Sequence, residues 1–223
     1  MYYLQKSSIS ENIIDLFHKE RYEPLILTIM NLSKVVFPEE YEYVENQSKG
    51  ECDYLGKTSH NKYDAKLPFL PQQVELLTNG KKHGPLIKTW IKELYDEAFE
   101  YQPLKMREDP SFSVKDTKLY RILEKAVQQD SSEENLVFFF PFPVVPAIPH
   151  PLLDITSNFL TRIYSELNKD YDFTLRSLYV IHASQLRGVL TLRNLKTRET
   201  EHLPFSAFDE YFSYNIESVF TNQ

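Results

Sequence analysis

Two acidic residues and one lysine stand close together in a short polar part of the sequence. Ten residues separate Asp53 from Asp64, and Lys66 follows Asp64 after a single intervening residue. Carboxylate oxygens are hard ligands that suit a divalent cation such as Mg²⁺. An amine beside such a cation can orient a water molecule or offset negative charge. These residue types at this spacing therefore predict metal-assisted hydrolysis.

A β-hairpin is the element that must position these residues. Residues 51–55 and 62–67 alternate in polarity, and the turn between them contains Gly56 and Asn61, which hairpin loops favour. Because residues two apart in a strand share a face, Asp64 and Lys66 lie on one face of the second strand. Asp53 can lie opposite them on the first strand. The less polar neighbours of the second strand, Tyr63, Ala65 and Leu67, then face the other way.

An acid on one strand followed by an acid-x-lysine sequence on the next resembles the active site of the PD-(D/E)XK nuclease superfamily, which has the restriction-endonuclease-like fold. The resemblance implies that Asp53 and Asp64 hold a metal ion, that the carbonyl of Ala65 completes its ligand shell, and that Lys66 is catalytic. Cys52 stands where the family often has a proline. The motif covers about residues 10–80; beyond them the similarity is only one of element order.

The same resemblance implies a glutamate on the preceding helix as a third metal ligand. Glu23 is the better candidate and Glu20 the second, although an acid at a helix N-terminus can serve only the helix dipole. Glu45 and Glu51 are further candidates, and Glu51 shares a strand face with Asp53.

A glutamine at the start of the helix that follows the lysine strand is also implied, in contact with phosphate or the attacking water. Gln73 fits this position best and Gln72 second. The alternative is an exposed polar first helical turn.

The apolar spacing elsewhere predicts an α/β (α+β) protein with a mixed central sheet flanked by helices. Helices are expected over residues 10–19, 23–35, 72–77, 85–101, 116–129, 151–168 and, as a short one, within 205–220. Strands are expected over 41–45, 136–140, 178–182, 187–193 and 201–203. Residues 136–140 are continuously apolar, which predicts a strand buried on both faces.

This order matches a restriction-endonuclease-like core with extra helices inserted, in a single domain of residues 1–223. Its parts are N-terminal helices (1–37), the hairpin active-site region (38–80), a helical insertion (81–134) and the remaining sheet and helices (135–223). The proline-rich apolar segment 141–149 cannot form a helix. It is expected to lie over the core as an extended arm, or to form a homodimer or protein-partner surface.

The composition narrows the classes of function. The net charge is −7 and the chain has a single cysteine, so a disulfide framework or a cysteine-based zinc site is not expected. Neither a signal peptide nor a run of 18 apolar residues is present, so a cytoplasmic protein without a membrane span is expected. Between residues 54 and 92 there are seven lysines and two acids, a local excess that would suit a phosphate backbone or simply a solvated surface.

The resemblance therefore implies a Mg²⁺- or Mn²⁺-dependent endo- or exonuclease, with DNA favoured over RNA as the substrate. Two alternatives stay open. The same fold could serve as a catalytically silent binding or scaffold module, or the hairpin could belong to an unrelated α+β protein. No P-loop, dinucleotide-binding or serine-hydrolase motif is present.

Overall fold

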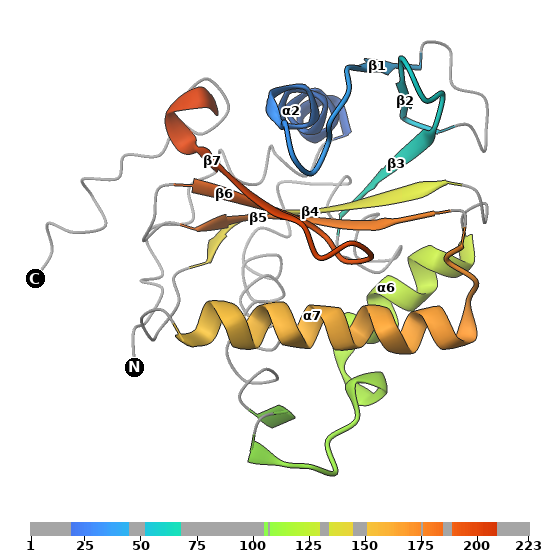
Figure 1. Ribbon diagram of the computed structural model, residues 1–223, viewed down its shortest axis with the longest axis vertical. Helices are drawn as coiled ribbons and strands as arrows, with labels where there is room; N and C mark the ends of the chain where they lie inside the picture. The colour runs from blue at the N-terminus through green and yellow to red at the C-terminus, as the bar shows by residue number, and fades with distance from the viewer. Residues whose placement is uncertain are drawn as a thin grey trace, which may run out of the picture.

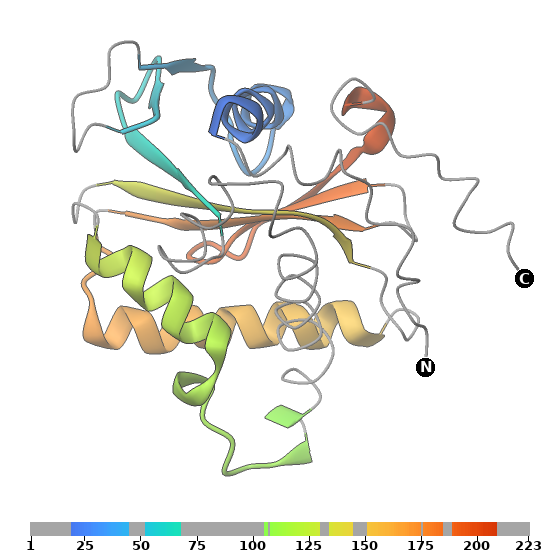
Figure 2. The same ribbon diagram turned by 180° about the vertical axis from the view of Figure 1, so that it is seen from behind.

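The described part of the chain forms a seven-stranded mixed sheet with helices on both faces (Figures 1 and 2). The computed structural model describes residues 19–44, 52–67, 105–106, 108–129, 134–144, 151–174, 176–184 and 189–208. The strands are β1 (Tyr41–Tyr43), β2 (Tyr54–Gly56), β3 (Lys62–Lys66), β4 (Asn135–Val144), β5 (Leu178–Ser184), β6 (Val189–Asn194) and β7 (Thr200–Pro204). The helices are α2 (Lys19–Leu32), α6 (Lys118–Gln129) and α7 (Pro151–Asp170), with 3₁₀ turns η3 (Val114–Asp116) and η5 (Phe205–Phe208).

The strands lie side by side in chain order. β1, β2 and β3 pair antiparallel, β3, β4 and β5 pair parallel, and β5, β6 and β7 pair antiparallel. Parallel neighbours need a long crossover, usually helical, and α7 supplies it between β4 and β5. α2 covers one face of the sheet, and α6 and α7 cover the other (Figures 1 and 2). The predicted mixed sheet flanked by helices is therefore confirmed.

The burial of β3 and β4 follows the sequence pattern. Tyr63 and Ala65 on β3 are buried, whereas Asp64 and Lys66 between and after them are partly exposed. On β4, residues 136–140 are fully buried, as their continuous apolar run predicts. The sheet centre is therefore apolar and buried, and the polar face of β3 is partly exposed beside it.

Helix α2 differs from the prediction. The sequence predicted a helix ending at residue 19 and a second one beginning at residue 23, but one helix runs through Pro24 from Lys19 to Leu32. Pro24 lacks an N–H and so forgoes one backbone hydrogen bond. Complete burial of Leu25, Ile26 and Ile29 outweighs that loss. Residues 1–18 lie outside the described part.

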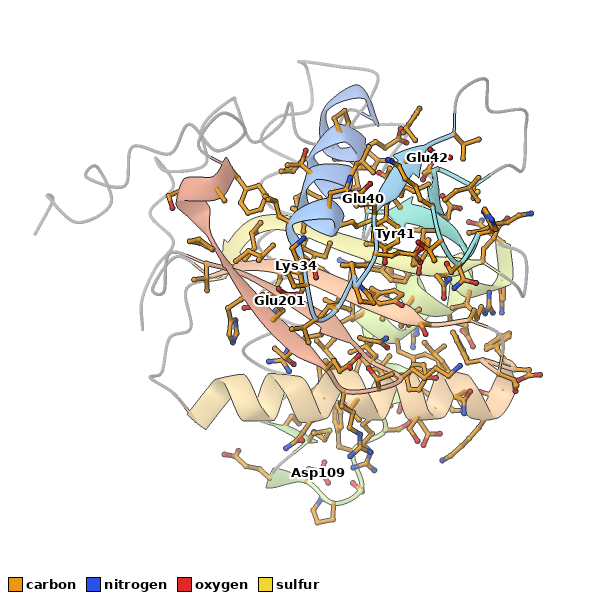
Figure 3. All side chains as sticks on the ribbon, turned by 45° about the horizontal axis from the view of Figure 1, so that its top comes forward. Lys34, Glu40, Tyr41, Glu42, Asp109 and Glu201 are labelled. Atoms are coloured by element: carbon orange, nitrogen blue, oxygen red, sulfur yellow. The ribbon has the colours of Figure 1, made fainter. Side chains whose placement is uncertain are left out.

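Glu201 connects the end of α2 to β7, the strand at the edge of the sheet opposite β1. Its carboxylate accepts hydrogen bonds from the Ser33 hydroxyl and from the backbone N–H groups of Lys34, Val35 and Val36, which follow α2. Figure 3 labels Glu201 and Lys34 where β7 passes the end of this helix. The carboxylate thereby fixes the chain that connects α2 to β1.

The proline-rich segment continues a strand where the sequence predicted an arm. β4 extends through Pro141 and Pro143 to Val144, and its register with β5 shifts between Phe140 and Pro143. A proline cannot donate to the ladder, so the strand accommodates these residues only with an irregularity. The remainder of the segment lies outside the described part.

Of the other boundaries, some coincide with the prediction, such as the starts of β1, β5 and α7, and the rest differ by a few residues. β2 begins at Tyr54 and so excludes Asp53, and α6 begins at Lys118 because η3 precedes it. Residues 205–208 of the expected C-terminal helix form a 3₁₀ turn. The helices predicted over 72–77 and 85–101 lie outside the described residues.

Candidate functional site

Asp53 lies immediately before β2, beside the central residues of β3. Its backbone N–H donates to the Tyr63 carbonyl at 3.0 Å, although Tyr54 is the residue paired with Tyr63. Two residues of one strand opposite one residue of its neighbour is the arrangement of a β-bulge, which redirects side chains. Asp53 is 3% exposed, and its carboxylate accepts a hydrogen bond from the Ala65 N–H at 2.8 Å. The first acid of the sequence pattern is thus held against the residue at the centre of the acid-x-lysine sequence.

Asp64 and Lys66 form an ion pair on the polar face of β3. Lys66 Nζ lies 2.6 Å from Asp64 Oδ2, and the two side chains are 27% and 14% exposed, respectively. Their positions two apart in a strand place them on one face. Solvent can therefore reach both charges, while the backbone that carries them is buried in the sheet.

The Ala65 carbonyl is oriented toward the same neighbouring strand as its N–H. In extended backbone the N–H and C=O of one residue point to the same side, and the Ala65 N–H points to Asp53. One backbone oxygen therefore accompanies two carboxylates, Asp53 and Asp64. These are the hard donors that Mg²⁺ and Mn²⁺ prefer, and Mg²⁺ commonly uses only one or two carboxylates with water and substrate oxygens. These donor types suit such an ion.

Glu23, the third acid that the resemblance implies, is engaged elsewhere. It is 2% exposed, and its Oε2 accepts a hydrogen bond from the Tyr43 hydroxyl at 2.7 Å. The Tyr54 hydroxyl donates to the Glu23 backbone carbonyl at 2.9 Å. Within the described residues, histidine, cysteine and acidic side chains nowhere gather in groups of three or more that could hold a metal. The structure therefore joins Asp53 to Ala65, and within its described part it does not gather Glu23, Asp53 and Asp64 into one ligand group.

Three tyrosines that the sequence did not single out line the acids. Burial raises the pKa of Tyr22, and the charges of Asp53 and Asp64 raise it further. Burial and the charge of Asp53 also raise the pKa values of Tyr43 and Tyr54. All three phenols therefore stay neutral at pH 7, and those of Tyr43 and Tyr54 donate hydrogen bonds to Glu23. Their common location depends on the packing of α2 against β1 and β2, for which the sequence gives no local signal.

Most of the other predicted site residues lie outside the described part of the chain. Gln73 and its alternative Gln72 lie outside the described residues, as do Glu45 and Glu51. Glu20 lies in the first turn of α2.

Comparison with known proteins identifies no relative of this chain. The chain matches no protein-family model, no curated protein and no solved structure. Within the described residues, none of the helices has the length and apolar character needed to cross a membrane. The function must therefore be inferred from the geometry of the site.

Proposed function

We propose that this protein is a Mg²⁺- or Mn²⁺-dependent nuclease that hydrolyses phosphodiester bonds, in DNA rather than in RNA. The observation that carries this proposal is the 2.8 Å hydrogen bond from the Ala65 N–H to Asp53. It joins an acid immediately before β2 to the Asp64–Ala65–Lys66 sequence on β3. The described elements run in the order helix, three antiparallel strands, helix α6, parallel strand, helix and parallel strand. With α6 taken as part of an insertion, this order supports a restriction-endonuclease-like core.

Each residue of the site has a proposed role. Asp53, Asp64 and the Ala65 carbonyl would hold the metal, which when bound polarises the phosphate and lowers the pKa of its water. The Lys66 side chain is 27% exposed, and its ammonium can turn from Asp64 to an oxygen of the substrate phosphate, where it offsets developing negative charge. Gln73 keeps its proposed contact with phosphate or water.

The charge of the site makes phosphate binding depend on the cation. Among the described residues of the proposed site, Asp53 and Asp64 carry two negative charges and Lys66 one positive charge. A phosphate diester would be repelled by that excess in the absence of a divalent ion. We therefore expect oligonucleotide affinity to rise when Mg²⁺ or Mn²⁺ is added and to fall again with a chelator.

Cleavage assays on a panel of substrates test the proposal. Labelled single-stranded, duplex and branched DNA and RNA are incubated with Mn²⁺ or with EDTA. Wild type should cleave at least one of them only with Mn²⁺, and Asp64→Ala should cleave none. Asp116→Ala, which removes an exposed acid from η3, is the matched control and should behave as wild type. Equal cleavage by Asp64→Ala and wild type would refute the assignment.

A catalytically silent scaffold with the same fold is the second candidate. The net charge of −7 and the use of Glu23 by Tyr43 rather than by a three-acid group favour it. A scaffold need not bind Mn²⁺, and substitution of Asp53 and Asp64 would leave its partner binding intact. No Mn²⁺ binding and no cleavage by wild type would favour this candidate over the nuclease.

A further inference from the structure

Glu23 of α2 binds two tyrosines on neighbouring strands. Its Oε2 accepts a hydrogen bond from the hydroxyl of Tyr43 on β1 at 2.7 Å, and its backbone carbonyl accepts one from the hydroxyl of Tyr54 on β2 at 2.9 Å. The two tyrosine rings also contact each other, with their centroids 6.1 Å apart and their planes at 62°. Glu23 is 2% exposed and Tyr54 is fully buried. One helix residue therefore holds both the end of β1 and the start of β2.

Both of these strand positions adjoin Asp53. Asp53 directly precedes Tyr54 in the chain. Val44, the residue after Tyr43, donates its backbone N–H to the Asp53 carbonyl at 3.0 Å. On its other side Asp53 donates its own N–H to the Tyr63 carbonyl at 3.0 Å. The position of the Asp53 backbone therefore depends on where Tyr43 and Tyr54 are anchored.

Glu23 approaches the sheet from the face opposite Asp64. Residues paired across antiparallel strands share a face, so the register puts Tyr43, Tyr54 and Tyr63 together on the face that α2 covers (Figures 1 and 2). Asp64 follows Tyr63 in β3 and so points to the other face. Glu23 is therefore separated from Asp64 by the sheet, but it is in contact with the strands that carry the backbone of the first acid.

We propose that Glu23 is a positioning residue of the metal site and not one of its ligands. Through the Tyr43 hydroxyl it holds the end of β1 against the Asp53 backbone, and this contact fixes the direction of the Asp53 carboxylate. This inference rests on the proposed metal-dependent function. The carboxylate accepts from the Ala65 N–H at 2.8 Å, so a shift of its backbone would strain that bond and move the oxygens relative to the cation. Groups that orient a metal ligand typically change the metal affinity about 10–100-fold when they are removed.

Mn²⁺ affinity, measured by electron paramagnetic resonance, distinguishes a positioning residue from a ligand. Tyr43→Phe removes only the hydroxyl and leaves the Glu23 carboxylate and its charge intact. We expect Tyr43→Phe nevertheless to bind Mn²⁺ about tenfold more weakly than wild type. If Glu23 were a ligand, the same variant would bind Mn²⁺ equally well or more tightly.

Two neutral substitutions of Glu23 provide the conservative comparison. Glu23→Gln keeps an oxygen that accepts from the Tyr43 hydroxyl, whereas Glu23→Leu fills a similar volume and accepts no hydrogen bond. Both lose the same charge, so the difference between them isolates the bond. We expect Glu23→Gln to bind Mn²⁺ about tenfold more tightly than Glu23→Leu. Adding Tyr43→Phe to Glu23→Leu should change the affinity no further, because the bond is already absent.

Amide hydrogen exchange tests the positioning without any metal. The Ala65 N–H is bound by the Asp53 carboxylate, and the Val44 N–H by the Asp53 carbonyl. In Tyr43→Phe both amides should exchange about tenfold faster than in wild type, measured by NMR relative to the Leu136 N–H of β4. The Leu136 reference removes any effect of global unfolding from the comparison.

Tyr120→Phe is the matched control. The Tyr120 hydroxyl donates to the Asp170 carboxylate at 3.2 Å, and α6, which carries it, covers the face of the sheet opposite α2 (Figure 2). The variant therefore loses the same kind of bond away from the site. Its Mn²⁺ affinity and its Ala65 exchange should equal those of wild type. Urea unfolding of every variant verifies that it is folded.

The outcomes also separate this inference from the proposed function. If wild type binds Mn²⁺, an unchanged affinity in Tyr43→Phe, or equal affinities of Glu23→Gln and Glu23→Leu, would overturn the inference and leave the metal site standing. No Mn²⁺ binding by wild type would refute the metal site. Faster Ala65 exchange in Tyr43→Phe would then still support the hold of Glu23 on Asp53, and unchanged exchange would overturn it.

Discussion

The carboxylate of Asp53 accepts a hydrogen bond from the backbone N–H of Ala65, 2.8 Å away across the end of the β2–β3 ladder. In a regular hairpin a strand carbonyl would accept from that amide. Here a side chain replaces it, because the bulge at Asp53 and Tyr54 ends the regular pairing. One carboxylate thus completes the sheet and forms part of the proposed site.

Substitutions of Asp53 should separate these two roles. Asp53→Asn keeps an oxygen for the Ala65 N–H but loses the charge, so its free energy of unfolding should stay within about 1 kcal/mol of wild type. Asp53→Ala leaves a buried amide without its acceptor and should lose about 1–3 kcal/mol. Urea unfolding measures both, and neither variant should cleave nucleic acid. Equal stability of the alanine and asparagine variants would show that the hydrogen bond contributes nothing.

Lys66 should matter for catalysis and not for stability. A partly exposed ion pair contributes about 0–1 kcal/mol, so Lys66→Met should unfold at nearly the wild-type urea concentration. The variant lacks the ammonium that would offset the negative charge developing on the phosphate, so its single-turnover cleavage rate should be about 100-fold lower or more. Lys62→Met is the matched control, because Lys62 is an exposed residue on the same strand. Equal rates for the two variants would remove Lys66 from the mechanism.

Glu201 should make the stability of the protein depend on pH. Partial burial alone raises the pKa of Glu201, but hydrogen bonds from Ser33 and from the backbone of Lys34, Val35 and Val36 outweigh it and lower the pKa. A carboxylate whose folded pKa is below its unfolded value of about 4.3 stabilises the protein above that pH. This contribution is lost as the pH falls through the folded pKa.

The comparison of Glu201→Gln with wild type measures this contribution. At pH 7 the variant should be about 1 kcal/mol less stable, allowing for the partial exposure of the carboxylate. The difference should shrink between pH 5 and pH 3, because wild type loses the charge there. Glu42→Gln, at an exposed position of β1, is the control. A difference that stays constant with pH would contradict the account.

Asn135 should be important for the stability of the sheet. Its buried side chain donates to the Lys62 carbonyl at 3.0 Å and accepts from the Ser177 N–H at 2.8 Å, linking β3 to the residue before β5. Asn135→Ala removes both hydrogen bonds and leaves the two backbone groups without this partner. It should lower the free energy of unfolding by about 2–3 kcal/mol, measured with urea. Asn61→Ala, at an exposed turn position, should change it by less than about 0.5 kcal/mol. Similar losses in both variants would show that the bridge is unimportant.

The local sequence predicted the elements that carry the site. The alternation of residues 62–67 gave the face shared by Asp64 and Lys66, and the run 136–140 gave the buried central strand. The alternation reflects a strand with one buried face, and the continuous apolar run reflects a strand with two. Both patterns can be read within a short stretch of sequence. The mixed sheet followed from the order of these elements along the chain.

Contacts between distant residues could not be predicted in this way. The bulge at Asp53, the bond between Tyr43 and Glu23, and the carboxylate of Glu201 beneath Lys34 each join separate elements. Proline also misled the prediction at Pro24, because apolar burial of the following residues keeps the helix continuous. Packing decides such positions, and local propensity is only a weak guide to them.

Manganese binding tests the central claim most directly, since it needs no knowledge of the substrate. Free Mn²⁺ is counted by electron paramagnetic resonance as the ion is added to wild type, Asp64→Ala and Asp116→Ala. Asp53 and Asp64 should hold about one Mn²⁺ per chain in wild type and in Asp116→Ala, and Asp64→Ala should lose that site. No binding by wild type, or unchanged binding by Asp64→Ala, would contradict the proposed metal centre.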